Sequence, residues 1–115
     1  MSKNKVKVIA ELCQNHNGDS GLIQEMVQAA AEAGADIAKI QFIDSADLTY
    51  RKKFDDGLIE DKEIKVIKRP YKEEYNRLKK LDLNKDDHLN FIEICKKFKI
   101  TPMTTIFNLS KIKYA

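Results

Sequence analysis

The chain has 115 residues and a mass of 13.3 kDa, which is the size of one domain. Charged residues make up 34% and hydrophobic residues 43%, the balance of a soluble globular protein, and no apolar run is long enough for a membrane span. Cys13 and Cys95 form no closely spaced pair, which excludes a disulfide framework and a zinc ribbon and is typical of a reducing cytoplasm. We therefore expect one cytoplasmic domain over residues 1–115, with no second domain and no membrane partner.

The charge is distributed unevenly along the chain. Residues 1–50 hold four Lys against seven Asp or Glu, a net charge of −3, whereas residues 51–115 hold 17 Lys or Arg against 11 Asp or Glu, a net charge of +6. Such a basic half can meet RNA or an anionic ligand, or it can simply form solvated helix faces. Because no aromatic residues are interleaved with a basic stripe, we expect no nucleic-acid partner.

The first part of the chain has the pattern of a strand, a helix and a second strand. Residues 6–11 are apolar and rich in β-branched side chains, as are residues 36–42, and both segments predict buried strands. Between them lies an apolar face at helical spacing, which Asp19 or Ser20 can cap and which Gly34 can terminate in the left-handed conformation. This order predicts a βαβ unit with two parallel strands.

The second part is less regular. Residues 43–69 are polar and weakly patterned, which predicts a long functional or mobile loop. A helix is predicted over residues 70–81, beginning with Pro70, and a second one over residues 85–98, capped by Asn84. The apolar face expected for that second helix consists of Leu89, Ile92, Cys95 and Phe98. A third strand follows at residues 100–107, and the alternation of strands and helices predicts an α/β architecture.

Polar and charged side chains follow the predicted strands. In parallel α/β proteins the binding and catalytic residues collect at the carboxyl ends of the strands. The residues that the chain places there are Glu11, Asn15, His16, Lys39, Gln41, Thr104 and Thr105. A charge within an apolar strand is costly unless it is paired or liganded. A functional site and a purely structural Glu11–Lys39 ion pair therefore both account for this pattern.

Residues 82–93 partly match a calcium-binding loop. Asp82, Asn84 and Asp86 stand at positions 1, 3 and 5 of that loop, and Glu93 stands at position 12. Position 6 is Asp87 instead of the glycine that the turn requires. A helix cap at Asn84, with acidic residues in the first turn, explains the same segment, so a calcium-binding helix–loop–helix is the weaker alternative.

Three segments of the chain resemble a known enzyme family. They are IAELCQNHNGD (9–19), MVQAAAEAGADIAKIQ (26–41) and LDLNKDDHLNFIEICKKFKITPMTTIFN (81–108), and they resemble the N-terminal half of N-acetylneuraminate (sialic acid) synthases, whose relatives make legionaminic and pseudaminic acids. The first two segments follow the family pattern I-x-E-x-x-x-N-H-x-G, then a helix, then A-G-A-D-x-x-K-x-Q. The resemblance weakens over residues 44–68.

The resemblance implies a fold and an activity. Such enzymes condense phosphoenolpyruvate with an N-acylated amino sugar, release phosphate and use a divalent metal such as Mn or Mg. Their fold is a (β/α)8 TIM barrel, which takes about 250 residues. The chain is therefore expected to hold about the first three βα units of such a barrel, to be inactive by itself and to bind no metal alone. A non-catalytic fragment or binding module is the alternative. Open sheet edges also predict a homo-oligomer.

The resemblance also implies roles for individual residues. Glu11 is expected to act beside the metal-bound water and the sugar aldehyde without ligating the metal directly, and Lys39 is expected to bind phosphoenolpyruvate. The residues expected to line the substrate sites are Asn15, His16, Gln41, Thr104 and Thr105. The family signature S-T-P-F reads Thr-Thr-Ile-Phe over residues 104–107, so its proline is replaced by Ile106.

Overall fold

The computed structural model describes residues 5–115 and divides into two compact units. The first, which we call the sheet unit, consists of residues 5–43 and 83–115. The second, which we call the hairpin unit, consists of residues 44–82. No helix in the described part of the chain is long and apolar enough to cross a lipid bilayer.

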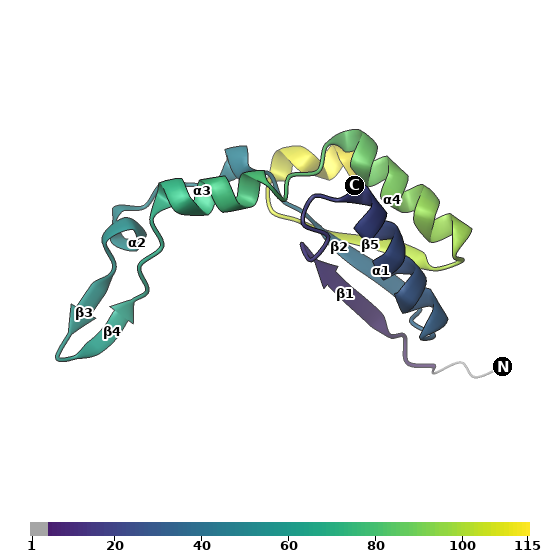
Figure 1. Cartoon of the computed structure of the whole chain (residues 1–115), viewed down its shortest axis with the longest axis horizontal. Coiled ribbons are helices and arrows are strands. Elements are labelled where there is room, and N and C mark those ends of the chain that lie inside the picture. The colour runs from purple at the N-terminus through teal and green to yellow at the C-terminus, as the bar shows by residue number, and fades with distance from the viewer. Residues whose placement is uncertain (1–4) are drawn as a thin grey trace. The chain divides into compact units, whose positions relative to one another are not determined.

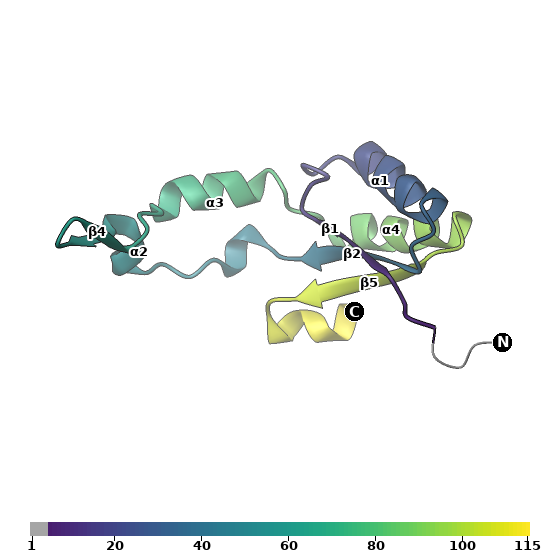
Figure 2. The ribbon, with the colours of Figure 1, turned by 90° about the horizontal axis from the view of Figure 1, so that it is seen from below.

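The sheet unit contains three parallel strands with helices on one face. The strands are β1 (Ile9–Cys13), β2 (Ile37–Phe42) and β5 (Thr101–Ile106), in the order β1-β2-β5. The helices α1 (Ser20–Glu32) and α4 (Lys85–Lys97) lie along the same face of this sheet (Figure 1, Figure 2). Parallel strands require crossover connections, and α1 provides the one between β1 and β2. The predicted α/β arrangement is confirmed for this unit.

The first strand begins later than its sequence pattern predicts. Residues 6–11 were expected to form it, but β1 starts at Ile9, and Val6 and Val8 are exposed. The carbonyl of Val8 accepts hydrogen bonds from the backbone N–H groups of Asp36 (3.0 Å) and Ile37 (3.2 Å), but the paired ladder of the two strands begins one residue later, at Ile9 and Ile37.

The predicted helix caps are confirmed in detail. The Asp19 carboxylate accepts hydrogen bonds from the backbone N–H groups of Gly21 (2.8 Å) and Leu22 (3.3 Å), so Asp19 caps α1. Gly34 has a φ of 88°, the left-handed conformation expected after the helix end. Asn84 forms a reciprocal capping box with Asp87 at the start of α4.

The core of the sheet unit lies between the strands and the two helices. Its buried members are Leu12, Ile23, Val27, Ala30, Ala38, Ile40, Phe91, Ile94, Cys95 and Ile100. The apolar face predicted for α4 is partly wrong, because Leu89 is 49% exposed and the buried positions are His88, Phe91, Ile94 and Cys95. A strict three-residue repeat drifts around a helix with 3.6 residues per turn, so Leu89 and Cys95 do not share one face. Burial raises the pKa of the Cys95 thiol to about 11.

The hairpin unit contains regular structure over residues 45–66, where a loop was predicted, followed by the helix that was predicted over residues 70–81. Its elements are η1 (Ser45–Asp47), α2 (Lys52–Asp56), β3 (Leu58–Glu60), β4 (Glu63–Val66) and α3 (Tyr71–Lys79). The two strands are antiparallel and are joined by Asp61 and Lys62, which both have positive φ. Turns of this kind usually carry Asn-Gly or Asp-Gly, so the sequence Asp-Lys gave no hairpin signal.

Two aspartates hold the hairpin unit together by accepting hydrogen bonds. Asp82 accepts a bond from the backbone N–H of Ser45 (2.9 Å) and another from its hydroxyl (2.5 Å). Asp55 accepts a bond from the backbone N–H of Tyr71 at 2.7 Å. Pro70 precedes α3 as its N-cap and is not the first helical residue that the sequence predicted. The unit therefore depends more on hydrogen bonds to these two aspartates, which we call its polar closure, than on a buried core.

Candidate functional site

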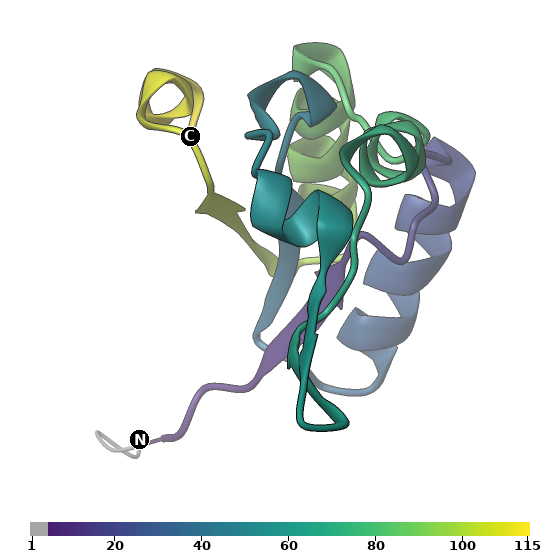
Figure 3. The same ribbon diagram turned by 90° about the vertical axis from the view of Figure 1, so that its left-hand side faces the viewer.

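Four of the predicted site residues share the face of the sheet that is opposite α1 and α4. Successive side chains along a strand point to opposite faces. Ala38, Ile40 and Phe42 are buried on the helix side of β2, so the side chains of Lys39 and Gln41 point to the other side. In the strand register Glu11 pairs with Lys39, and Gln41 pairs with Thr105. Glu11, Lys39, Gln41 and Thr105 therefore lie on one face, on three adjacent strands. Figure 3 shows α1 and α4 on the other side of the sheet.

An ion pair joins the first two of these residues. The Lys39 Nζ lies 2.8 Å from a carboxylate oxygen of Glu11, and the backbone N–H of Cys13 donates to the other oxygen at 3.1 Å. The hydrogen bond from Lys39 lowers the pKa of Glu11, an effect that partial burial opposes. Both side chains keep contact with solvent, with 26% of Lys39 and 40% of Glu11 exposed. An exposed pair contributes about 0–1 kcal/mol to stability, so a ligand can displace it at little cost.

The loop after β1 separates the predicted Asn15-His16 pair. Asn15 is exposed, whereas only 1% of His16 is accessible. The Nδ1 atom of His16 accepts a hydrogen bond from the backbone N–H of Gly18 at 2.9 Å, which fixes the turn into α1. His16 therefore shapes the loop, and Asn15 reaches its surface; that the two residues line the sugar pocket stays a prediction.

The two predicted threonines of β5 also point in different directions. Thr105 pairs with Gln41 on the face opposite α1 and α4, while Thr104 pairs with Ile40 on the side of these two helices. The hydroxyl oxygen of Thr104 is buried and has no hydrogen-bond partner among the described residues. Strand alternation makes this separation unavoidable for adjacent residues, so only Thr105 stands beside Gln41 and Lys39.

A second histidine lies near the carboxyl end of β2, and the sequence gave no reason to single it out. His88 is 9% exposed and stacks on Phe42 with 3.9 Å between the ring centroids. Burial lowers the pKa of both His16 and His88, and the nearby carboxylate of Asp87 raises both values in part. The positive charges of His16 and Lys111 lower the pKa of His88 further. The Nε2 atoms of both histidines are buried without a hydrogen-bond partner in the described part of the chain. Burial therefore favours the neutral form of both rings.

The described residues do not form a metal site by themselves. Residues 5–115 contain no group of three or more His, Cys, Asp or Glu side chains placed to hold an ion. In the segment predicted as an alternative calcium loop, Asn84 and Asp87 cap α4 and Asp82 binds Ser45. The structure therefore favours the helix cap over the calcium-binding alternative.

Comparison with known proteins gives a consistent result. The chain is 35% identical over 108 residues to an N,N'-diacetyllegionaminic acid synthase of Legionella pneumophila, a match that covers 93% of this chain and 29% of that protein. It is 39% identical over 54 residues to a pseudaminic acid synthase of Helicobacter pylori, covering 47% of this chain and 16% of the relative. The chain thus spans less than a third of the length of these relatives.

A solved structure supports the same assignment. The N-acetylneuraminic acid (sialic acid) synthetase of Leptospira borgpetersenii, determined in complex with citrate, matches 96% of this chain with a TM-score of 0.72 and 28% identity, over 32% of its own length. Residues 26–115 match the sequence model of the NeuB family. The parallel sheet, its helices and this match over most of the chain establish that the protein belongs to the NeuB family.

Proposed function

We propose that this chain supplies part of the active site of a nonulosonic acid synthase that condenses phosphoenolpyruvate with an N-acylated amino sugar. The observation that carries the proposal is the common face of Glu11, Lys39, Gln41 and Thr105 on three adjacent parallel strands. Adjacent strands are about 4.8 Å apart, so these side chains can contact one small ligand. Membership of the NeuB family, whose relatives include legionaminic and pseudaminic acid synthases, supports the same conclusion.

The fold of the complete site is part of this proposal. The strands β1, β2 and β5 would be the first three of a (β/α)8 barrel, with α1 and α4 on its outside. In such a barrel the face that the helices leave free is the interior, and the active site lies at the carboxyl ends of the strands. Lys39, Gln41 and Thr105 would then point into the barrel.

The proposed chemistry assigns a role to each polar side chain. Carbon 3 of phosphoenolpyruvate forms a bond to the aldehyde carbon of the open-chain sugar, water adds at carbon 2, and phosphate leaves by cleavage of its C–O bond. Lys39 would bind the phosphate or carboxylate of phosphoenolpyruvate, and the Thr105 hydroxyl would donate a hydrogen bond to it. Glu11, once released from Lys39, would accept a proton from the attacking water.

The roles at the sugar side rest on fewer groups. Gln41 lies beside Lys39 on the same face, and Asn15 is exposed after β1, so these two would contact the amino sugar. The hydroxyl of Thr104 and the ring of His16 are buried, so these two would not contact the amino sugar. The resemblance implies a divalent metal, for which residues 5–115 do not form a site by themselves.

Binding of phosphoenolpyruvate tests the proposal directly. Titration of the chain, followed by amide NMR shifts, should show saturable binding with the largest shifts along β2 and β5. Lys39→Ala should weaken binding at least 10-fold, since a charge-assisted contact contributes about 1.5–3 kcal/mol. Lys97→Ala, which removes an exposed lysine of α4, is the matched control and should bind as the wild type does.

A chimaera tests the same residues in an assembled enzyme. This chain would replace the corresponding segment of the Legionella pneumophila synthase, and phosphate release from phosphoenolpyruvate would be measured. If Lys39 binds phosphoenolpyruvate equally in the ground and transition states, Lys39→Ala raises the KM for it and leaves kcat nearly unchanged. Unchanged kinetics in the Lys39→Ala chimaera would contradict the assignment.

A further inference from the structure

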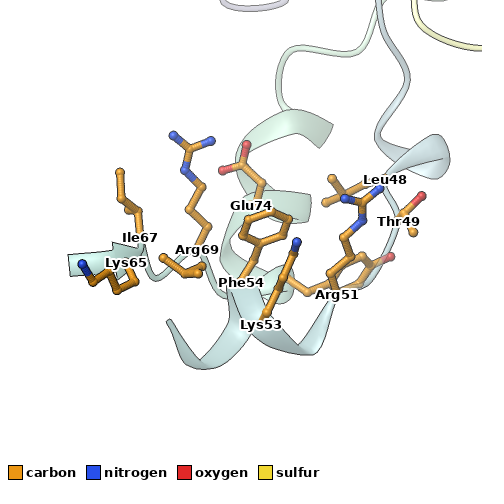
Figure 4. Close-up of a pocket in the computed structure, with 11 residues that line it drawn as sticks. Leu48, Thr49, Arg51, Lys53, Phe54, Lys65, Ile67, Arg69 and Glu74 are labelled. Atoms are coloured by element: carbon orange, nitrogen blue, oxygen red, sulfur yellow. The ribbon is translucent and has the colours of Figure 1, made fainter. Parts of the chain in front are cut away.

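The hairpin unit contains a cavity. Its lining includes none of Glu11, Lys39, Gln41 and Thr105, which form the proposed synthase face. Its volume is about 740 Å³, within the range typical of small-molecule sites. Its walls come from the segment before α2, from α2 itself, from β4 and the residues after it, and from the start of α3 (Figure 4). The residues that line it are Leu48, Thr49, Arg51, Lys53, Phe54, Lys65, Val66, Ile67, Arg69, Tyr71 and Glu74.

The charge of the cavity is strongly positive. Four cationic side chains line it against the single carboxylate of Glu74. That carboxylate is already engaged by the Arg77 guanidinium, whose hydrogen bonds lower the pKa of Glu74. Among the residues that the structure describes, Arg51, Lys53 and Arg69 take part in no ion pair. The charge of Arg69 also lowers the pKa of Glu74, so this one carboxylate faces both Arg77 and Arg69. The lining therefore keeps an excess of positive charge, which favours an anion.

The rest of the lining is apolar and aromatic. Phe54 stands between Arg69 and Arg51 in Figure 4, with Lys53 beside its ring. The Arg51 guanidinium and the Lys53 ammonium lie 5.9 and 5.1 Å from the ring centroid. Leu48, Val66 and Ile67 add apolar surface. An inorganic anion would leave this surface in contact with water, whereas an organic anion would cover it.

The backbone holds the principal groups in place. The backbone N–H of Arg69 donates to the carbonyl of Phe54 at 2.6 Å, and the N–H of Phe54 donates to the carbonyl of Arg51 at 3.0 Å. These bonds tie the segment after β4 to α2. The backbone at Arg51, Phe54 and Arg69 is therefore fixed before any ligand arrives, so that part of the entropy cost of binding is already met.

We propose that this cavity binds a small organic anion: a phosphate or carboxylate joined to an aromatic or apolar body. Arg69, Arg51 and Lys53 would contact the anionic group, and Phe54 with its apolar neighbours would pack against the body. None of the residues that line the cavity belongs to the face that carries Lys39.

Phenyl phosphate is a suitable probe, because it combines both features. Titration of the 115-residue chain, followed by amide NMR shifts, should show saturable binding with shifts at Arg51, Phe54 and Arg69. Inorganic phosphate lacks the body and phenol lacks the charge, so each should bind at least 10-fold more weakly. Equal binding of inorganic phosphate would show that only charge is recognised and would overturn the proposal.

Substitutions then locate the site. Arg69→Ala and Phe54→Ala should each weaken phenyl phosphate binding about 10-fold or more. The matched control is Lys80→Ala, which removes an exposed cation at the other end of α3. Lys39→Ala should leave phenyl phosphate binding unchanged, since Lys39 belongs to the proposed phosphoenolpyruvate site. Loss of phenyl phosphate binding in Lys39→Ala, or none in Arg69→Ala, would overturn the assignment.

Discussion

The two units of the chain hold their charged residues by different means. In the sheet unit, Glu11 and Lys39 stand on strands whose opposite face is packed against a buried core. In the hairpin unit, Arg51 and Arg69 stand on short segments fixed by backbone and aspartate hydrogen bonds, and Ser45 and Leu78 are the buried side chains. The first arrangement follows from a repeating apolar pattern. The second depends on individual contacts, so its geometry is sensitive to single polar substitutions.

The largest expected effect is a loss of unfolding free energy when a core residue of the sheet unit is truncated, compared with the equivalent change in the hairpin unit. Ile40 is 1% exposed in the sheet unit, whereas Ile59 is 71% exposed in the hairpin unit. Ile40→Ala should lower the free energy of unfolding by about 2–5 kcal/mol, because it leaves a cavity. Ile59→Ala should change it by at most about 0.5 kcal/mol. Urea denaturation measures both, and a comparable loss in the two variants would mean that the hairpin unit has a core of its own.

The second effect concerns the polar closure of the hairpin unit. Asp82→Ala removes both acceptors of Ser45 and leaves a buried N–H and hydroxyl unpaired. The loss should be about 1.5–3 kcal/mol. Amide hydrogen exchange should detect it in residues 44–82, with the sheet unit nearly unaffected. Glu60→Ala, an exposed position on β3, is the control and should exchange as the wild type does.

The same difference explains what could be predicted from the sequence. The strands around Lys39 and the caps at Asp19 and Asn84 follow from period, β-branching and side-chain chemistry, and the structure has them within a few residues. The hairpin was not predicted, because its turn at Asp61 and Lys62 lacks the usual glycine. Its cavity left only one trace in the sequence, the excess of Lys and Arg after residue 50.

Side-chain direction was the least predictable part of the candidate site. Motif spacing groups Thr104 with Thr105 and Asn15 with His16, but strand alternation and loop burial separate each pair. A sequence motif shows which residues occur together, but it does not show which side chains point toward a ligand. Thr104 and His16 occupy buried positions in the structure, while Thr105 stays beside Gln41 and Asn15 stays exposed.

The third expected effect is a pH dependence confined to the sheet unit. Burial lowers the pKa of His16 and His88 from the usual 6.5, so the unfolded chain takes up protons there before the folded chain does. Stability should therefore fall as the pH drops below about 6.5, until the folded-state pKa values are reached. Asp87 limits the loss, and Lys111 adds to it at His88.

Replacement of one histidine separates this effect from general acid denaturation. His88→Phe keeps an aromatic ring to stack on Phe42 but takes up no proton. The slope of the unfolding free energy against pH, between about pH 5 and 6.5, should decrease by up to about 1.4 kcal/mol per pH unit, the contribution of one proton. An unchanged slope in His88→Phe would assign the pH dependence to other groups.

The smallest expected effect concerns the ion pair on the proposed synthase face. The hydrogen bond from Lys39 lowers the pKa of Glu11, so this contribution to stability is present above the unfolded pKa of about 4.5 and is lost as the pH falls through the lower folded value. Because both side chains are partly exposed, the change in unfolding free energy should be small. A 13C NMR titration of the Glu11 carboxyl should nevertheless show that its pKa is higher in Lys39→Ala than in the wild type. The pKa of Glu11 should not change in Lys97→Ala.

Saturation with phosphoenolpyruvate relates this ion pair to the proposed function. If phosphoenolpyruvate binds Lys39, Glu11 loses the hydrogen bond from Lys39 that lowers its pKa. It also gains a nearby anion, and both changes raise the pKa of Glu11. The Glu11 pKa should therefore rise on addition of phosphoenolpyruvate and stay unchanged on addition of phenyl phosphate, which is expected to bind in the hairpin unit. A carboxylate whose pKa rises when substrate arrives is a stronger base for the water that adds at carbon 2. A Glu11 pKa that stays low in the presence of phosphoenolpyruvate would mean that the ion pair is structural and that the anion binds elsewhere.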